Sequence, residues 1–335
     1  MHQGFKIPVI RLSGSIVVTY DQKYDYPHRS EAQIENEKNL RDITYNGYMS
    51  PKTKSKVRKY LTTWINSIVS LKGLSHNPNL NKIPYLTFVT LTLPSKQVHS
   101  DNEMKRKALM PFIELLKRKY DVWNYFWRAE AQKNDNIHFH LIIDSYIKWQ
   151  DLRFEWNNLM DKLGYIEPFF LKFHHRNPNS TDIHRLNGVG DAAEYLLKYV
   201  SKSEGYRKIK GRIHGCSDRV RCLHPYECEL DTTAFEAIKE LKKSKDARHI
   251  EEELYSVFMV DNSIWYGPSW EKLKKREHKY LVDLAIDLYS NKEASIIEQA
   301  EAAALRYYEE HQQVYEQTSI PFCSNYLIPG AWDQA

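Results

Sequence analysis

The chain is poor in several features that would assign it to a broad class of proteins. It has only four cysteines in 335 residues, too few for a disulfide scaffold in a chain of this length. No apolar run approaches the roughly 18 to 20 residues that span a bilayer, and residues 1–12 lack the small-residue cleavage site of a secretory signal. We therefore expect a cytoplasmic protein with no membrane partner.

Two familiar kinds of binding site are also missing. The phosphate-binding pattern G-x-x-x-x-G-K-[ST] occurs nowhere in the chain, so we expect no nucleotide cofactor and no fused helicase. Cysteines and histidines gather between His214 and Cys228, but their spacing matches no common zinc pattern. We interpret these cysteines as small hydrophobic residues rather than zinc ligands.

Excess charge of either sign is small. The chain has 48 Lys and Arg against 43 Asp and Glu, a net charge of +5, which leaves the partner open because nucleic-acid binders need basic residues clustered on one face. Two basic clusters exist, in residues 52–59 and 207–212. Such runs are more often solvated surface than contacts with DNA.

What the chain does contain is an alternation of predicted strands and helices, which indicates an α+β fold with a mostly antiparallel sheet. Strands are predicted at 14–20, 85–93, 125–132, 137–144, 165–173 and 180–186. Helices are predicted at 50–71, 100–120, 149–163, 191–201, 232–255 and 270–315. We divide the chain into a core at 84–205, an N-terminal extension at 1–83 that packs on it, and a mostly helical C-terminal region at 206–335 of unknown function.

The strand at 137–144 carries two histidines on one face. Successive strand residues alternate faces, so His138 and His140 point together to one side while the apolar residues between and around them point to the other. Two imidazoles placed in this way can bind one divalent metal ion, although a polar strand face has the same pattern.

A carboxylate on the preceding predicted strand completes a possible metal site. Glu130 joins His138 and His140 if the intervening loop has an odd number of residues or contains a bulge, because an even loop would turn Glu130 to the other face. Two imidazoles and a hard carboxylate, with positions left open, favour Mg²⁺ or Mn²⁺.

The predicted helix at 191–201 carries tyrosines beside lysines. Tyr195, Lys198, Tyr199 and Lys202 follow helical spacing and form one stripe, with an apolar stripe nearly opposite. Tyrosines at this spacing usually pack in a core, but packing does not explain the lysines. A tyrosine needs roughly 4 kcal/mol to become a phenolate at pH 7, which a neighbouring ammonium and a metal-polarised phosphate can supply. Attack on a phosphodiester would leave a covalent phosphotyrosine.

These motifs and their order resemble those of the HUH endonucleases, the rolling-circle replication initiators of single-stranded DNA phages, plasmids and small viruses. Residues 88–94 (FVTLTLP) are similar to the first family motif, a strand of threonines and apolar residues. The pair His138-Phe139-His140, preceded by Glu130, is similar to the second. Residues 195–202 (YLLKYVSK) are similar to the doubled Tyr-x-x-Lys of the third. The resemblance covers about 120 residues.

The resemblance implies a role for each of these residues. His138 and His140 would be metal ligands, with Glu130 as the third. Tyr199 would be the nucleophile beside Lys202. Tyr195 and Lys198 would form a second pair for the alternate transesterification.

It also implies a fold and an activity. Family members have a five-stranded antiparallel sheet with the histidines on a central strand, flanked by helices; here helical extensions would be added. The implied reaction is metal-dependent, site-specific nicking and rejoining of single-stranded origin DNA through a 5′-phosphotyrosine, which leaves a 3′-hydroxyl primer. A host helicase and polymerase would be partners, in the bacterial cytoplasm if a phage or plasmid encodes the chain.

Two alternatives stay open. The chain could be a plasmid relaxase or a single-strand transposase of the same superfamily, although such transposases are usually shorter with one tyrosine and relaxases tend to carry an extra histidine. It could also be a non-catalytic DNA-binding protein.

Overall fold

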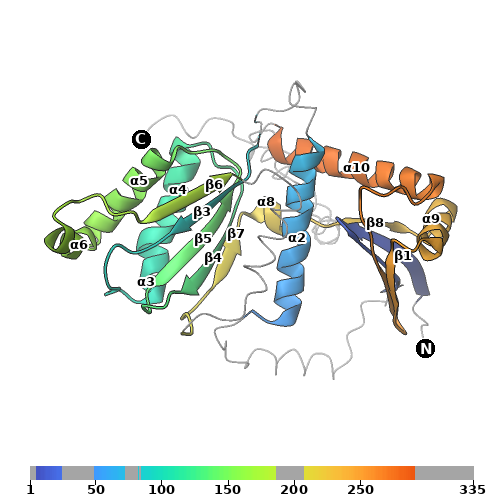
Figure 1. Ribbon diagram of the computed structural model, residues 1–335, viewed down its shortest axis with the longest axis horizontal. Coiled ribbons are helices and arrows are strands. Elements are labelled where there is room, and N and C mark those ends of the chain that lie inside the picture. The colour runs from blue at the N-terminus through green and yellow to red at the C-terminus, as the bar shows by residue number, and fades with distance from the viewer. Residues whose placement is uncertain (1–4, 25–48, 72–81, 83, 186–206, 291–335) are drawn as a thin grey trace, which may run out of the picture.

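The computed structural model describes residues 5–24, 49–71, 82, 84–185 and 207–290 (Figure 1). Within these residues the strands form two five-stranded sheets, antiparallel throughout, with helices packed around them. The predicted α+β fold with a central five-stranded antiparallel sheet is confirmed. None of the described helices is long and apolar enough to cross a membrane.

The first sheet carries the residues singled out by the sequence. In spatial order it consists of β6 (Thr181–Arg185), β3 (Thr87–Leu91), β5 (Ile137–Ile143), β4 (Tyr125–Ala131) and β7 (His214–Cys216). The strand with the two histidines, β5, is therefore central. Its other face is apolar, and the side chains of Phe139 and Leu141 are fully buried there.

Helices from the middle of the chain cover this apolar face. They are α4 (Met110–Lys119) and α5 (Trp149–Lys162), which lie behind the sheet in Figure 1. Phe112 and Trp156 meet edge to face between them, with ring centroids 5.2 Å apart, and belong to the same buried cluster as Phe139. Burying the apolar face of β5 in this way turns its histidine face outward.

The helical segment before β4 was predicted as one helix at 100–120, and it is continuous. It consists of α3 (Asp101–Met104), a π-helical turn η1 (Lys105–Leu109) and α4. The Ser100 hydroxyl accepts from the Glu103 N–H while the Glu103 carboxylate accepts from the Ser100 N–H. This reciprocal capping box explains why the helix begins at this position.

The predicted helix at 50–71 is α2 (Pro51–Ser70). Ser50 caps it by accepting from the Thr53 N–H at 3.1 Å, and Pro51 occupies the first helical position, as expected of a helix start. Its apolar stripe, with Trp64 fully buried, joins the core of the first sheet. Thus α2 belongs structurally with residues that follow it much later in the chain.

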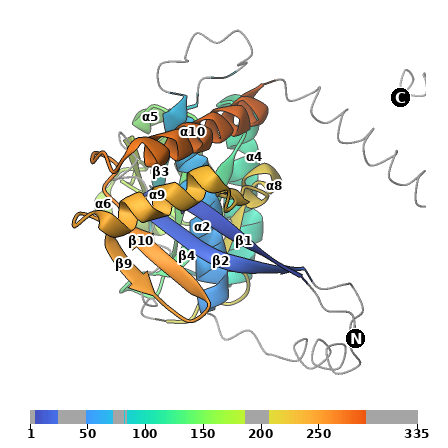
Figure 2. The ribbon, with the colours of Figure 1, turned by 90° about the vertical axis from the view of Figure 1, so that its right-hand side faces the viewer.

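The second sheet joins the two ends of the described chain (Figure 2). In spatial order it consists of β8 (Tyr226–Glu229), β1 (Phe5–Ser13), β2 (Ile16–Tyr24), β10 (Tyr255–Met259) and β9 (Arg248–Glu251). Two helices, α9 (Thr232–Lys243) and the first turns of α10 (Pro268–Tyr289), cover it with a separate apolar cluster. The short helix α8 (Asp218–Arg221) follows β7.

Three predictions of local structure need correction or limits. Residues 165–173, predicted as a strand, form the helix α6 (Ile166–Phe173), which ends where His174 adopts a left-handed conformation (φ 59°). The helix predicted at 232–255 stops at Lys243, because residues 248–259 pair as β9 and β10. The helix at 191–201 and the part of the last helix beyond residue 290 lie outside the described residues.

Candidate metal centre

The β4–β5 hairpin satisfies the condition set for Glu130. The loop between the strands contains residues 132–136, an odd number, and the register places Glu130 directly opposite His138 and Arg128 opposite His140. Directly opposite residues share a face of the sheet. Glu130 therefore lies on the histidine face.

Asparagines make the turn in which many relatives carry glycine. Asp135 takes a left-handed conformation (φ 64°), and the Asn134 side chain accepts from the Asn136 N–H at 3.2 Å. Asn136 then anchors the turn, since its side chain donates to the Ser95 carbonyl and accepts from the Gln97 N–H, both at 2.8 Å. The hairpin geometry is thereby held without glycine.

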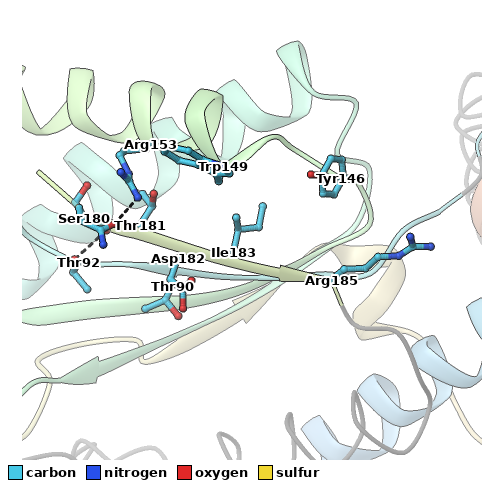
Figure 3. A pocket seen from close by; sticks show the side chains of 11 residues that line it. Thr90, Thr92, Tyr146, Trp149, Arg153, Ser180, Thr181, Asp182, Ile183 and Arg185 are labelled. Carbon is cyan, nitrogen blue, oxygen red and sulfur yellow. Dashed lines mark hydrogen bonds between the residues drawn. The ribbon is translucent and has the colours of Figure 1, made fainter. Parts of the chain in front are cut away.

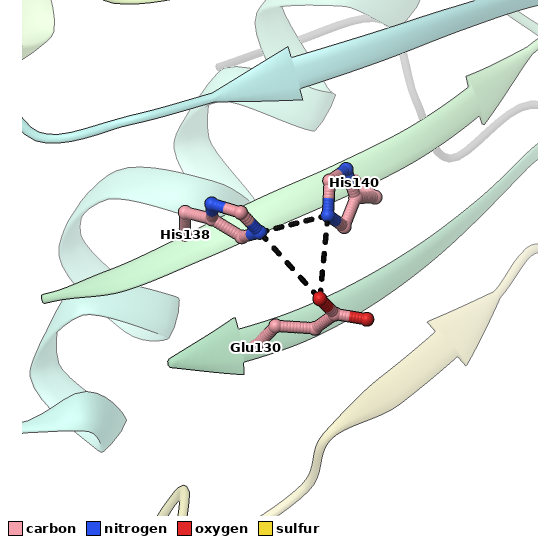
Figure 4. A group of neighbouring side chains, drawn as sticks. All are labelled: Glu130, His138 and His140. Carbon is pink, nitrogen blue, oxygen red and sulfur yellow. Dashed lines mark hydrogen bonds and ion pairs between the residues drawn. The ribbon is translucent and has the colours of Figure 1, made fainter. Parts of the chain in front are cut away.

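The three side chains converge on one point (Figure 4). His138 Nε2 lies 2.7 Å from His140 Nε2, and Glu130 Oε2 lies 3.7 Å and 3.6 Å from these two nitrogens. Neighbouring ligands of a small divalent ion with bonds of about 2.1 Å lie roughly 3 Å apart. Residues Glu130, His138 and His140 therefore fit a metal ion, and they form the one such group found among the described residues.

The site is largely shielded from solvent. The side chains of Glu130, His138 and His140 are 6%, 15% and 7% exposed. Burial works against the charged form of Glu130, but hydrogen bonding to the two histidines and the positive charge of Arg128 outweigh it and lower its pKa. The carboxylate therefore stays ionised and able to bind a cation.

One histidine is held from behind by the neighbouring strand. Thr90 on β3 pairs directly with His140, and its hydroxyl lies 3.2 Å from His140 Nδ1. The ring of Phe88 stacks on the same imidazole at 5.3 Å. When Nδ1–H donates to this hydroxyl, the lone pair of Nε2 faces Glu130, which is the tautomer a metal ligand requires. The first motif marks this strand in the sequence, but only the register identifies Thr90.

A hollow of about 550 Å³ opens beside the centre, around the edge strand β6 (Figure 3). Thr90 lines it and separates it from His140, and Asp182 lies beside Thr90 on β6. On the far side Trp149 and Arg153 project from the start of α5, with the Arg153 guanidinium 4.6 Å from the Trp149 ring. Sequence reasoning did not single out these two residues, because their proximity to β3 depends on the docking of α5.

The other predicted site residues are not placed. Tyr195, Lys198, Tyr199 and Lys202 lie outside the described residues. The cysteines discounted as zinc ligands are dispersed, with Cys216 on β7 of the first sheet and Cys228 on β8 of the second.

Comparison with known proteins gives one match. Residues 86–204 match a family model that describes replication-associated proteins of the ORF2 type. The matched segment contains β3, β4, β5 and β6, all three residues of the candidate metal centre and both tyrosines of the third motif. The resemblance to rolling-circle replication initiators is thereby confirmed over this replication-associated segment. No curated protein and no solved structure matches the chain.

Proposed function

We propose that this protein is a rolling-circle replication initiator that nicks and rejoins single-stranded origin DNA. The observation that carries the proposal is the convergence of Glu130, His138 and His140 on one face of the central sheet, inside the segment that matches replication-associated proteins. A replication role implies binding to DNA, and the chemistry of the cluster suits an enzyme acting on phosphodiesters.

The three side chains would hold Mg²⁺ or Mn²⁺. Such an ion would polarise the scissile phosphate and stabilise the charge that develops on it. The protein contributes a preformed site, because Thr90 orients His140 and the ionised Glu130 balances the ion's charge without further rearrangement.

Tyr199 is the proposed nucleophile, with Lys202 beside it. Its phenolic oxygen bonds to phosphorus as the bond to the 3′ oxygen breaks; the phenolic proton is lost to solvent, and the departing oxygen gains one as the 3′-hydroxyl primer. The product is a 5′-phosphotyrosine, which conserves the phosphodiester energy for rejoining. Tyr195 with Lys198 would carry out the second transesterification when the replicated strand is released.

The hollow at β6 suits a nucleotide of the strand being cut. Trp149 offers an exposed ring and Arg153 a cation beside it, the combination by which proteins hold unpaired bases. Residues 84–205 would form the endonuclease core. Strand separation and synthesis would depend on a helicase and polymerase of the host, in the cytoplasm of a bacterium if a phage or plasmid encodes the chain.

Covalent capture of DNA tests this function. The purified protein is incubated with a labelled single-stranded oligonucleotide pool and Mn²⁺, and a protein–DNA adduct is sought on a denaturing gel. We expect an adduct with the natural chain and with the Tyr280→Phe control, none with Tyr195→Phe/Tyr199→Phe, and none after chelation. Absence of any adduct would leave a non-catalytic DNA-binding protein, and an adduct that survives the double substitution would refute the nucleophile assignment.

A further inference from the structure

Two basic segments that lie far apart in the sequence meet in the structure. A hollow of about 440 Å³ lies between the first turns of α2 and the edge strand β7. Its cationic lining residues come from both sequence clusters and from α8: Lys52, Lys56, Arg212 and Arg221. We refer to these four residues and the hollow between them as the basic groove.

The charges of the basic groove are poorly compensated. No Asp or Glu is among its described lining residues. Arg221 pairs with Asp218, but within the described part of the chain the exposed side chains of Lys52, Lys56 and Arg212 form no ion pair. A positive potential therefore remains in the groove.

The start of α2 adds to this potential. Helix N-termini carry partial positive charge and favour acidic residues in the first turn, yet the first turn of α2 contains none. It contains Lys52 instead, with Lys56 one turn further on. Placing lysines at this end opposes helix stability unless an anion is bound nearby.

His214 reports the same potential from the opposite wall. Burial, together with the nearby charges of Arg212 and Arg128, lowers the pKa of His214 to about 4. His214 is therefore neutral at pH 7, and added positive charge at this point of β7 is disfavoured.

The floor of the groove is aromatic. Tyr60 from α2 and Trp127 from β4 are buried beneath it. Gly215 permits this close packing, since a Cβ at that position would lie 2.7 Å from Trp127 Nε1. Cations above an aromatic floor suit the backbone and sugar of a flexible nucleic-acid strand.

The basic groove lies next to the candidate metal centre. His214 pairs with Arg128, which in turn pairs with His140, so the groove is two strands from the metal ligands along one row of the sheet. With strands about 4.8 Å apart this separation is roughly 10 Å. The hollow around β6 lies on the other side of the centre.

We propose that the basic groove binds the phosphodiester backbone of single-stranded DNA flanking the segment that is cut. The inference rests on the proposed function for its substrate and adds a second contact with it, outside the metal centre. The groove binds this backbone without reading sequence, because its lysines and arginines present charge to phosphates rather than a pattern of donors to bases. A single strand is favoured over a duplex since only a flexible strand can enter a hollow of this size.

Binding measured without cleavage tests the groove. Fluorescence anisotropy is recorded with a labelled single-stranded 30-nucleotide DNA of mixed sequence, in EDTA, across a range of salt concentrations. Each lost phosphate contact reduces the slope of log affinity against log salt by about 0.7 for single strands. We expect Lys52→Ala/Lys56→Ala/Arg212→Ala to bind at least tenfold more weakly at low salt and to reduce the slope by about two.

A matched triple variant controls for loss of charge alone. Lys243→Ala/Lys245→Ala/Lys272→Ala removes three exposed cations that do not line the groove, and we expect it to bind like the natural chain. Equal affinities and slopes for the two triple variants would overturn the proposal, as would a loss confined to a duplex of the same length. Because no cleavage is involved, a normal groove result with no covalent adduct would refute the proposed function alone, and the reverse result would refute the groove alone.

Discussion

At the scale of single residues, the position of Glu130 depends on the parity of one loop. The five residues 132–136 bring Glu130 opposite His138, and one residue more or fewer without a bulge would turn the carboxylate to the covered face. The two histidines need no such condition, because they lie on the same strand two residues apart. The sequence could therefore place the histidines together directly but the carboxylate only conditionally.

Thr90 is expected to act on the metal through His140. Thr90→Val keeps the shape of the side chain and removes the hydroxyl 3.2 Å from His140 Nδ1. We expect Mn²⁺ affinity, measured by calorimetric titration, to fall about 10- to 100-fold, the usual range for a group that orients a metal ligand. Thr90→Ser restores the hydroxyl and should recover most of the affinity.

The control at this position is the next threonine on the same face of β3. Thr92 donates to the Ser180 carbonyl, not to a histidine, so Thr92→Val should leave Mn²⁺ affinity within a few fold of the natural value. Equal losses for the Thr90 and Thr92 variants would assign both to general packing.

At the scale of elements, α10 connects the two sheets. Its first turns contribute Trp270 and Leu273 to the core of the second sheet, and its last turns contribute Leu288 and Tyr289 to the core of the first. The contact with α2 contains a buried hydrogen bond, in which Trp64 Nε1 donates to the Tyr289 hydroxyl at 2.9 Å. Burial raises the pKa of Tyr289 well above its usual value, so the hydroxyl is neutral.

Removing this hydroxyl should weaken the whole fold. Tyr289→Phe leaves the indole N–H of Trp64 buried without its acceptor, and we expect the free energy of unfolding to fall by about 1–3 kcal/mol. Urea denaturation followed by tryptophan fluorescence measures it. Tyr280→Phe, which removes a more exposed hydrogen bond to the His224 carbonyl, should cost less; an equal or larger cost there would contradict the role given to the buried pair.

Elements also differ in how far sequence patterns predict them. The hairpin of β4 and β5 was predicted because its strands are adjacent in sequence and its alternation is strict. The strand predicted at 165–173 was wrong, since its continuous apolar run suits a helix or a strand equally and only packing beside α5 selects α6. The helix predicted to 255 failed because β9 and β10 form by pairing with β2, far away in the chain.

At the scale of the whole molecule, the first sheet is not assembled from residues 84–205 alone. Strand β7 comes from residues 214–216, and the buried cluster around the sheet includes Trp64 of α2 and Tyr289 of α10. A separate core for this segment would lack all three.

We therefore expect residues 84–205, expressed alone, to lose the cooperative thermal unfolding of the full chain. Residues 1–290 retain every described element and should unfold cooperatively, as followed by circular dichroism. Cooperative unfolding of the 84–205 fragment near the temperature of the full chain would contradict this expectation and show that α2, β7 and α10 are dispensable additions.

The sequence by itself determined the features that depend on short spacing. Alternation along one strand puts His138 and His140 on one face, helical spacing aligns Tyr195, Lys198, Tyr199 and Lys202, and the order of these motifs indicates a replication initiator. The tertiary structure alone decided which distant residues meet. Strand register joined Thr90 to His140, and the packing of α2 against β7 brought the two basic segments together. Local spacing is set by bond geometry, whereas these encounters depend on how apolar surfaces from the whole chain are buried together.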